Sequence, residues 1–324
     1  MRLALVLLLL ILSLTATSVQ TQLKSTPKGL VNRPALNKFL AALTAAKGGT
    51  RLEPVRIMHF GDSHVAADVL TRNIRSLFQN EFGDAGPGFI VPRNPMSTRR
   101  VGVLSGASDG WVIEGIGGRT SPDNIYGPAG IDLATSNPGE LAWLETSCNH
   151  FEIYFVRLPG GGRMDVAIDG VTQLDAPINL TAPKTQLDSL SFDLPDDTVH
   201  RIEVRTLNSG RIRLLGIVAE HLTPAIAYDV FGINGARANR ILGWNQAALT
   251  KAIKERNPNL IIIAYGTNEL TDDDWTAASY EALLATIIQR FQAAAPQASI
   301  LVFAPPDRAD LPLNNRLRAL IEAE

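Results

Sequence analysis

Residues 55–64 read VRIMHFGDSH, and this stretch decides the fold class. Alternating apolar side chains through its first six positions predict a strand, and Gly61 and Asp62 then form a tight turn. From Val65 to Phe82 the apolar residues repeat at spacings of three and four, which predicts an amphipathic helix. Strand, turn and helix in this order are the opening unit of an α/β sheet.

The same succession of strands and helices returns after residue 222. The last two apolar runs are continuous, as in strands of a parallel sheet that is covered on both faces. We therefore predict an α/β fold with a parallel sheet covered on both faces. The predicted strands here are residues 227–233, 260–265 and 299–304, and the predicted helices of the chain include residues 36–46, 238–255, 277–294 and 313–323.

The middle of the chain has a different pattern. It is rich in Gly and Pro, and short alternating runs such as residues 151–155 and 201–204 are separated by turn signals such as residues 159–162. This pattern is typical of an all-β sandwich inserted into the α/β domain. The predicted organisation is a signal peptide at 1–21, the first part of the α/β domain at 22–91, the inserted sandwich at 92–222 and the second part of the α/β domain at 223–324.

The N-terminus predicts export. Arg2 precedes an apolar run over residues 3–14, followed by a small polar stretch to Gln22. The run is shorter than the roughly 20 apolar residues that span a bilayer, so it is typical of a signal peptide. An uncleaved N-terminal anchor is the alternative. No later segment has the length and apolar character of a membrane span, and we expect a periplasmic or secreted protein.

Composition excludes several classes of partner and site. The 324 residues carry a formal net charge of -2, which gives no reason to expect nucleic acid as a partner. Cys148 is the only cysteine, so an intrachain disulfide and a cysteine metal site are both excluded, and a buried apolar role is expected. The acidic run 272–274 fits a helix start better than a metal site. We predict no cofactor and no metal, and the oligomeric state stays open.

Three turns at the ends of predicted strands carry the chemistry. Ser63 follows the first strand, Gly235 follows a second and Asn268 follows a third. The carboxyl ends of neighbouring strands form the ligand crevice of an open α/β sheet. A nucleophilic serine there, with the amides of Ser63 and Gly235 and the side chain of Asn268, would form an oxyanion hole. Taken singly, each has a structural alternative: a helix N-cap for Ser63, a turn for Gly235 and an Asx-type cap for Asn268.

The amino-acid sequences of four segments resemble those of one protein family. Residues 61–64 (GDSH), 83–89 (GDAGPGF), 232–236 (GINGA) and 265–269 (YGTNE) are similar to the blocks of the SGNH (GDSL-like) hydrolases, in the branch of bacterial peptidoglycan O-acetylesterases. That branch carries a β-sandwich resembling a carbohydrate-binding module between its first two blocks, where residues 92–222 stand here. The resemblance implies a serine esterase with an SGNH-type (flavodoxin-like) three-layer parallel sheet, and we expect Asp62, His64 and Glu269 to help bind its substrate.

One block of the family is missing. The family takes its general base from an Asp-x-x-His block near the C-terminus, and this sequence has no such block. Its five histidines are His59, His64, His150, His200 and His221, none of which follows Asn268. We expect structural roles for these histidines, with His64 shaping the pocket or capping the helix. We also expect the α/β domain to be C-terminally incomplete and the base to come from outside this sequence.

Three functions are compatible with these features. The leading hypothesis is an esterase that removes acyl groups, above all acetyl, from cell-wall glycan such as peptidoglycan. An SGNH-type O-acyltransferase would pass the acyl group from the serine to a sugar hydroxyl instead of water. A non-catalytic glycan-binding protein would use the sandwich alone. The expected partner in each case is an acylated glycan.

Overall fold

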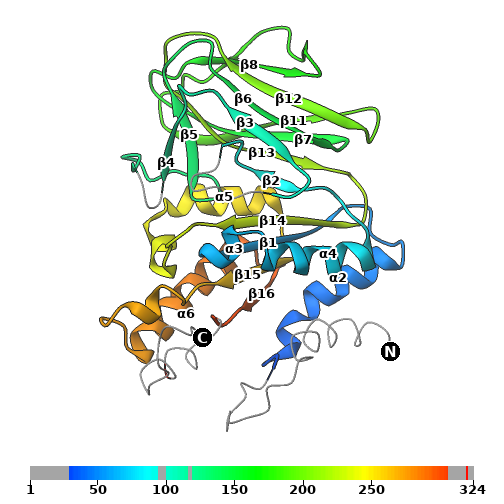
Figure 1. Ribbon diagram of the computed structural model, residues 1–324, viewed down its shortest axis with the longest axis vertical. Coiled ribbons are helices and arrows are strands. Elements are labelled where there is room, and N and C mark those ends of the chain that lie inside the picture. Colours follow the sequence, from blue (N-terminus) through cyan, green and yellow to red (C-terminus); the bar gives the residue numbers. More distant parts are fainter. Residues whose placement is uncertain (1–28, 94–99, 116–118, 306–318, 320–324) are drawn as a thin grey trace.

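The computed structural model describes residues 29–93, 100–115, 119–305 and 319 (Figure 1). The predicted signal peptide and, apart from residue 319, the predicted helix 313–323 lie outside these residues. The described chain forms an α/β part and a β-sandwich, which are stacked along the long axis in Figure 1. Among the described helices, none has the length and apolar character needed to cross a membrane.

The sheet of the α/β part contains four parallel strands. They are β1 Val55–Gly61, β14 Ile226–Gly232, β15 Leu260–Ala264 and β16 Ser299–Val302. The order β14-β1-β15-β16 places the first strand of the chain between two strands from its far end. All four strands run in the same direction, so the carboxyl ends of β14, β1 and β15 lie at one edge of the sheet. The predicted parallel α/β sheet is confirmed.

Helices cover both faces of this sheet. They are α2 Asn37–Lys47, α4 Leu70–Phe82, α5 Gln246–Arg256 and α6 Ala277–Ala294. On one face, Phe39 of α2 and Phe78 of α4 pack against Ile57 of β1. On the other face, the ring of Phe60 lies 4.8 Å from the ring of Phe291 in α6. Successive side chains of β1 point to opposite faces, so the two sets of helices have separate cores and the fold has three layers.

Two predicted helices are interrupted. The pattern over residues 65–82 contains the short helix α3 Ser63–Ala66, then a break, then α4. Asp68 in the break has φ 52, and its carboxylate accepts hydrogen bonds from Thr71, Arg75 and the N–H of Val101. These contacts hold the left-handed residue that ends the first helix.

The predicted helix 238–255 is also divided in two. Its first part is a 3-10 helix, Ala238–Gly243, and α5 begins after it. Trp244 is extended, and the side chain of Asn245 accepts a hydrogen bond from the N–H of Ala248 at 3.1 Å. Asn245 thereby caps the N-terminus of α5, and the chain changes direction between the two parts.

The middle of the chain folds as the predicted sandwich. Its strands are β2 Gly88–Ile90, β3 Leu104–Ala107, β4 Val112–Gly115, β5 Ile131–Thr135, β6 Leu141–Ser147, β7 His150–Arg157, β8 Arg163–Ile168, β9 Val171–Thr172, β10 Ile178–Asn179, β11 Gln186–Asp193, β12 Val199–Thr206 and β13 Ile212–Glu220. One antiparallel sheet has the order β10-β8-β12-β6-β3, with β9 paired to β8. The other has the order β11-β7-β13-β5-β4, and β2 pairs with its β13. Because β2 is part of the second sheet, the sandwich includes residues before the predicted boundary at 92.

Burial in the sandwich follows the alternation seen in the sequence. Along β6, Ala142, Leu144 and Thr146 are buried, and the residues that alternate with them are half-buried. Cys148 lies in the core, where burial raises the pKa of its thiol to about 12. The thiol is therefore protonated and inert at neutral pH, as expected for a small apolar residue.

A buried charge network joins the sandwich to the α/β part. Glu220 at the end of β13 accepts hydrogen bonds from Arg56 of β1 and from Arg256 of α5. Arg256 also binds Asp229 of β14, with two nitrogen–oxygen distances of 3.0 Å. Burial alone would raise the pKa of Glu220, but Arg256 and Arg56 lower it to about 2. Because Arg56 lies near the start of β1, the network anchors the end of β13 near the amino end of the parallel sheet.

Candidate active site at the strand ends

Ser63 is the first residue of α3, directly after the carboxyl end of β1. The N-cap of this helix is Asp62, whose Oδ1 accepts a hydrogen bond from the N–H of His64 at 2.9 Å. Asp62 therefore caps this helix, and Ser63 does not have the structural role of an N-cap. The Ser63 side chain is half-buried, and its amide belongs to the first turn of a helix, where N–H groups have no intrahelical acceptor.

Gly235 lies in the turn after β14. It has φ 71, a left-handed conformation that favours glycine, and the turn closes with a 3.0 Å hydrogen bond from the N–H of Ala236 to the carbonyl of Ile233. The N–H of Ile233 in turn donates to the carbonyl of Gly61 at 3.1 Å. The turn that carries Gly235 is thus bonded directly to the strand end that carries Ser63.

Asn268 lies in the turn after β15 and faces the Gly235 turn. Its Nδ2 donates a hydrogen bond to the carbonyl of Ala236 at 2.8 Å. A carboxamide has two N–H hydrogens, so this contact orients the group and leaves the second hydrogen for a ligand. Its side chain makes no capping bond to the short 3-10 helix that follows, Glu269–Thr271, so the structural alternative for Asn268 is not what the structure shows.

Glu269 and Asp62 lie in the interior, each with 1% of its surface exposed. The Oε1 of Glu269 accepts from the N–H of Ala238 at 2.7 Å, and its Oε2 accepts from the N–H of Gly266 at 3.2 Å. Burial raises the pKa of Glu269 and the nearby Asp62 adds to this rise, whereas the backbone N–H groups oppose it. Substrate binding by these two acids stays a prediction; Glu269 contacts the backbone of the strand-end turns, and Asp62 contacts the amide and the imidazole of His64.

His64 is the one predicted substrate-binding residue with an exposed side chain, at 43%. Its Nδ1 lies 3.2 Å from the Oδ1 of Asp62 and 3.4 Å from the Oγ1 of Thr267. The imidazole therefore bridges the first and third turns at the mouth of the site. The role of His64 in shaping the pocket stays a prediction.

The other four histidines lie away from Ser63. His59 is buried in β1 with its Nδ1 2.7 Å from the hydroxyl of Tyr228, and burial lowers its pKa to about 3. The N–H of His221 donates to Ala85, and Ala85 donates to Ile226 at the amino end of β14. That end is roughly 20 Å from the Ser63 edge, since β14 rises about 3.3 Å per residue. The three histidines of the sandwich each bind an aspartate: His150 with Asp193 at the end of β11, His200 with Asp169 and Asp196, and His221 with Asp197.

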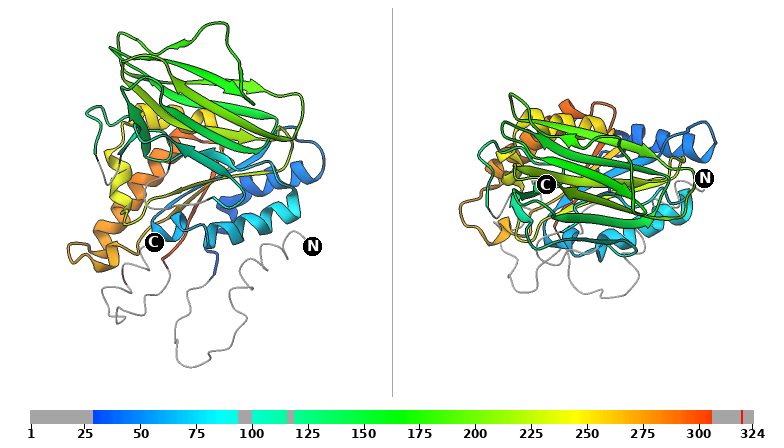
Figure 2. Two further views of the ribbon diagram at one scale, coloured as in Figure 1. Left: turned by 45° about the horizontal axis from the view of Figure 1, so that its top comes forward. Right: turned by 90° about the horizontal axis from the view of Figure 1, so that it is seen from above.

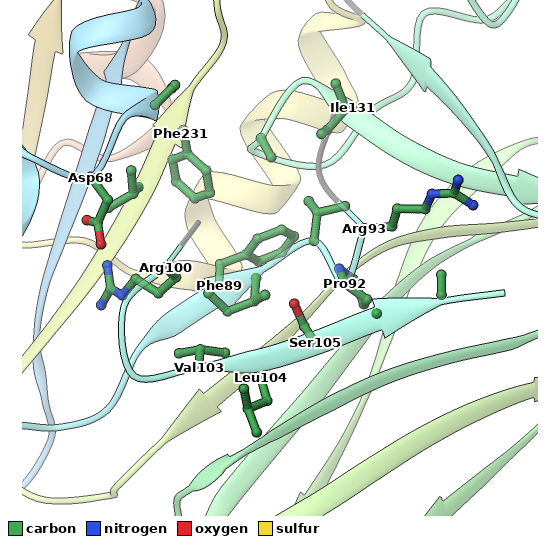
Figure 3. A pocket seen from close by; sticks show the side chains of 18 of the residues that line it. Asp68, Phe89, Pro92, Arg93, Arg100, Val103, Leu104, Ser105, Ile131 and Phe231 are labelled. Carbon is green, nitrogen blue, oxygen red and sulfur yellow. The ribbon is translucent and has the colours of Figure 1, made fainter. Parts of the chain in front are cut away.

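A cavity of about 690 Å³ lies between α3, the end of β14 and the sandwich (Figure 3). Ala66 and Gly232 line it from the α/β part, and the sandwich side includes Ser105, Ile131 and Trp143. Ala66 is three residues beyond Ser63, or about 4.5 Å along a helix axis. The sandwich therefore borders the same side of the molecule as the helix that carries Ser63, and both views of Figure 2 show the two parts packed together.

Comparison with known proteins finds one family similar to the C-terminal part of the chain and one solved structure with the same fold. Residues 188–323, which include Gly235 and Asn268, match the GDSL-like Lipase/Acylhydrolase family. A solved structure of a peptidoglycan O-acetylesterase matches with a TM-score of 0.70 and 20% identity, over 90% of this chain and 79% of that one. At this identity the likeness shows a shared fold. No curated protein matches the chain.

Two family two carbohydrate esterases are more distant. The enzyme from Clostridium thermocellum, in complex with cellohexaose, has 10% identity and a TM-score of 0.27 over 59% of this chain and 78% of that one. The enzyme from Cellvibrio japonicus has 16% identity and a TM-score of 0.25 over 68% and 82%. We draw nothing from these two. The chain therefore has an SGNH-type α/β fold with an inserted all-β domain, and its residues 188–323 are similar to the GDSL-like lipase/acylhydrolase family of carboxylic ester hydrolases.

Proposed function

We propose that the protein is an O-acetylesterase acting on cell-wall glycan, with Ser63 as its nucleophile. One observation carries the proposal: the side-chain amide of Asn268 is bonded to the Gly235 turn, at the sheet edge where Ser63 begins α3. A nucleophile and three candidate donors from three different strand ends therefore share one edge. This is the constellation that acyl transfer through a serine requires.

The proposed reaction has two halves. In the first, Ser63 Oγ bonds to the ester carbonyl carbon, and the carbonyl oxygen becomes an oxyanion that accepts from the N–H groups of Ser63 and Gly235 and from Asn268 Nδ2. The tetrahedral species then collapses, the sugar hydroxyl leaves with a proton, and acetyl-Ser63 remains. In the second half, water attacks this ester through the same oxyanion, and acetate leaves.

The proton of Ser63 must pass to a base. The sequence has no Asp-x-x-His block, the sandwich histidines are each bound to an aspartate, and His221 lies near the amino end of β14. His64 is the one histidine at the Ser63 edge, with Nδ1 toward Asp62. His64 is therefore the imidazole of this chain to test as the base, and His221 provides a matched control.

Two observations support cell-wall glycan as the substrate. The matched structure is that of a peptidoglycan O-acetylesterase, which shares the sandwich as well as the α/β part over 90% of this chain. The sandwich also borders a cavity of about 690 Å³ next to α3, a volume in the usual range for ligand sites. The apolar run at residues 3–14 supports export to the compartment where such glycan occurs.

The test uses the full chain with two substrates, an aryl acetate and O-acetylated peptidoglycan. Acetate should be released from both substrates. A fluorophosphonate should label Ser63 in the wild type and should not label the Ser63→Ala variant. Labelling that persists in Ser63→Ala would exclude Ser63. Hydrolysis of the aryl acetate alone would refute the glycan substrate, and acetyl transfer to a glycan without free acetate would favour the acyltransferase. Glycan binding without any labelling of Ser63 would favour a binding protein.

A further inference from the structure

Glu269 links two of the active-site turns through a single side chain. Its carboxylate accepts from the N–H of Ala238, just beyond the Gly235 turn, at 2.7 Å, and from the N–H of Gly266, at the start of the Asn268 turn, at 3.2 Å. The two contacts connect segments that follow different strands, β14 and β15. With 1% of its surface exposed, Glu269 is shielded from a bound substrate.

The chemistry of the contact requires a carboxylate. Both oxygens of Glu269 face backbone N–H donors, so the site needs two acceptors. An ionised carboxylate has only acceptor sites, whereas the amide of glutamine has one acceptor and one donor group. A glutamine of the same size would place an NH₂ against a backbone N–H, and one of the two contacts would be lost.

The residue before Glu269 makes the neighbouring link. Asn268 donates to the carbonyl of Ala236, two residues before the Ala238 amide that Glu269 holds. Gly235, which supplies the proposed second oxyanion donor, directly precedes Ala236. A movement of the 233–238 turn would therefore displace the Gly235 amide and the acceptor that orients Asn268 together.

We propose that Glu269 is a positioning residue for the oxyanion hole, whose carboxylate ties the Gly235 turn to the Asn268 turn and sets the spacing of their donors. The proposal rests on the proposed roles of Gly235 and Asn268. Glu269 acts through these two groups without contacting the substrate. Its removal should therefore lower kcat, which depends on the oxyanion hole, more than it changes KM.

The kinetic test uses the full chain and an aryl acetate, so it does not depend on the glycan. Glu269→Gln should lower kcat by about 100-fold, the cost of a displacement near 1 Å, with KM changed by less than about threefold. Glu269→Asp keeps both acceptor oxygens, so its kcat should fall by less than that of Glu269→Gln. The matched control is Glu220→Gln, a buried acid at the opposite end of the sheet, which should keep kcat per folded molecule. Wild-type kcat in Glu269→Gln would overturn the proposal.

A double-mutant cycle separates positioning from a general loss of stability. If Glu269 acts through the oxyanion hole, Glu269→Gln should reduce kcat much less in an Asn268→Ala background than in the wild type, because coupled residues are not additive. Full additivity of the two losses would contradict the proposal.

Amide hydrogen exchange tests the link without any turnover. Loss of the carboxylate should accelerate exchange at Ala238 and Gly266 in Glu269→Gln, with the amides of β1 unchanged. Unchanged exchange in the 233–238 turn would overturn the proposal even in a protein that hydrolyses no ester. Conversely, if Glu269→Gln accelerates exchange at these amides but the wild-type protein does not hydrolyse acetylated glycan, only the proposed substrate is refuted.

Discussion

Gly232, the last residue of β14, lies against the backbone of Ala66 in α3. A Cβ atom added at Gly232 would lie less than 3.0 Å from both the nitrogen and the Cα of Ala66. The helix that begins with Ser63 therefore packs backbone to backbone on the strand that leads to Gly235. This contact sets how far the proposed nucleophile lies from the proposed oxyanion turn.

Gly232→Ala should disturb both stability and turnover. The added methyl group meets backbone atoms, which cannot rotate away, so we expect a loss of about 1–3 kcal/mol in the free energy of unfolding and a clear fall in kcat. Urea unfolding and aryl acetate hydrolysis measure the two effects. Gly243→Ala is the matched control, because a Cβ there meets nothing within 4 Å, and it should change stability by less than about 0.5 kcal/mol. Equal behaviour of the two variants would contradict the packing role of Gly232.

Asn268→Ala should lower kcat by about 100- to 1000-fold, the usual cost of one oxyanion donor. The variant removes the Nδ2 group that is bonded to Ala236. Steady-state hydrolysis of an aryl acetate measures the loss, with Gln297→Ala, a surface amide bonded to Asn257, as the control. Full activity of Asn268→Ala would exclude the donor role.

His200 predicts a pH dependence of stability that originates in the sandwich. Burial alone would lower the pKa of His200, but Asp169 and Asp196 raise it above its usual value. A raised pKa in the folded state means that protonated His200 stabilises the fold below about pH 6.5, the unfolded value, and that this contribution is lost as the pH rises through the folded pKa.

The difference in free energy of unfolding between wild type and His200→Ala should become smaller as the pH rises. Wild type should exceed His200→Ala in free energy of unfolding by more at pH 5 than at pH 8. Urea unfolding at several pH values between these limits keeps the partner aspartates ionised. A difference in free energy of unfolding that grows toward pH 8 would contradict the predicted direction of the pH dependence. The exposed Lys184 supplies the control as Lys184→Met, whose stability difference from wild type should stay constant over this pH range.

Arg256→Met should destabilise the protein strongly, because Asp229 and Glu220 would keep buried charges without their shared partner. We expect a loss of about 3–5 kcal/mol, the range for one removed partner of a buried ion pair. Arg205, 60% exposed and 3.7 Å from Glu203, is the control, and Arg205→Met should cost little. Chemical denaturation measures both.

The cost of Arg256→Met should also depend on pH. Glu220 has its pKa lowered to about 2, so its contribution is present above its unfolded pKa and is lost as the pH falls toward 2. The difference between wild type and Arg256→Met should therefore narrow in acid. A difference that stays constant from pH 7 to pH 3 would contradict this linkage.

The sequence by itself determined the helices and strands whose apolar residues recur at regular spacing. The predicted helix 277–294 has the same bounds in the structure, and the predicted strand 260–265 differs by one residue. Apolar periodicity reports which side chains of one element are buried, and this information lies within a few residues of sequence. The same local signals also separated the sandwich from the α/β part and placed Ser63, Gly235 and Asn268 at strand ends.

The tertiary structure alone decided which of these residues meet and where elements break. The break at Asp68 depends on Arg75 and on Val101, which is 33 residues away along the chain. The Glu269 contact with Ala238 crosses 31 positions, and the contact between His64 and Thr267 crosses 203. Such partners follow from the strand order β14-β1-β15, because hydrogen bonds between neighbouring strands bring their ends together. Periodicity carries no record of that order, so the sequence indicated the three turns, and only the folded sheet showed how they are held to one another.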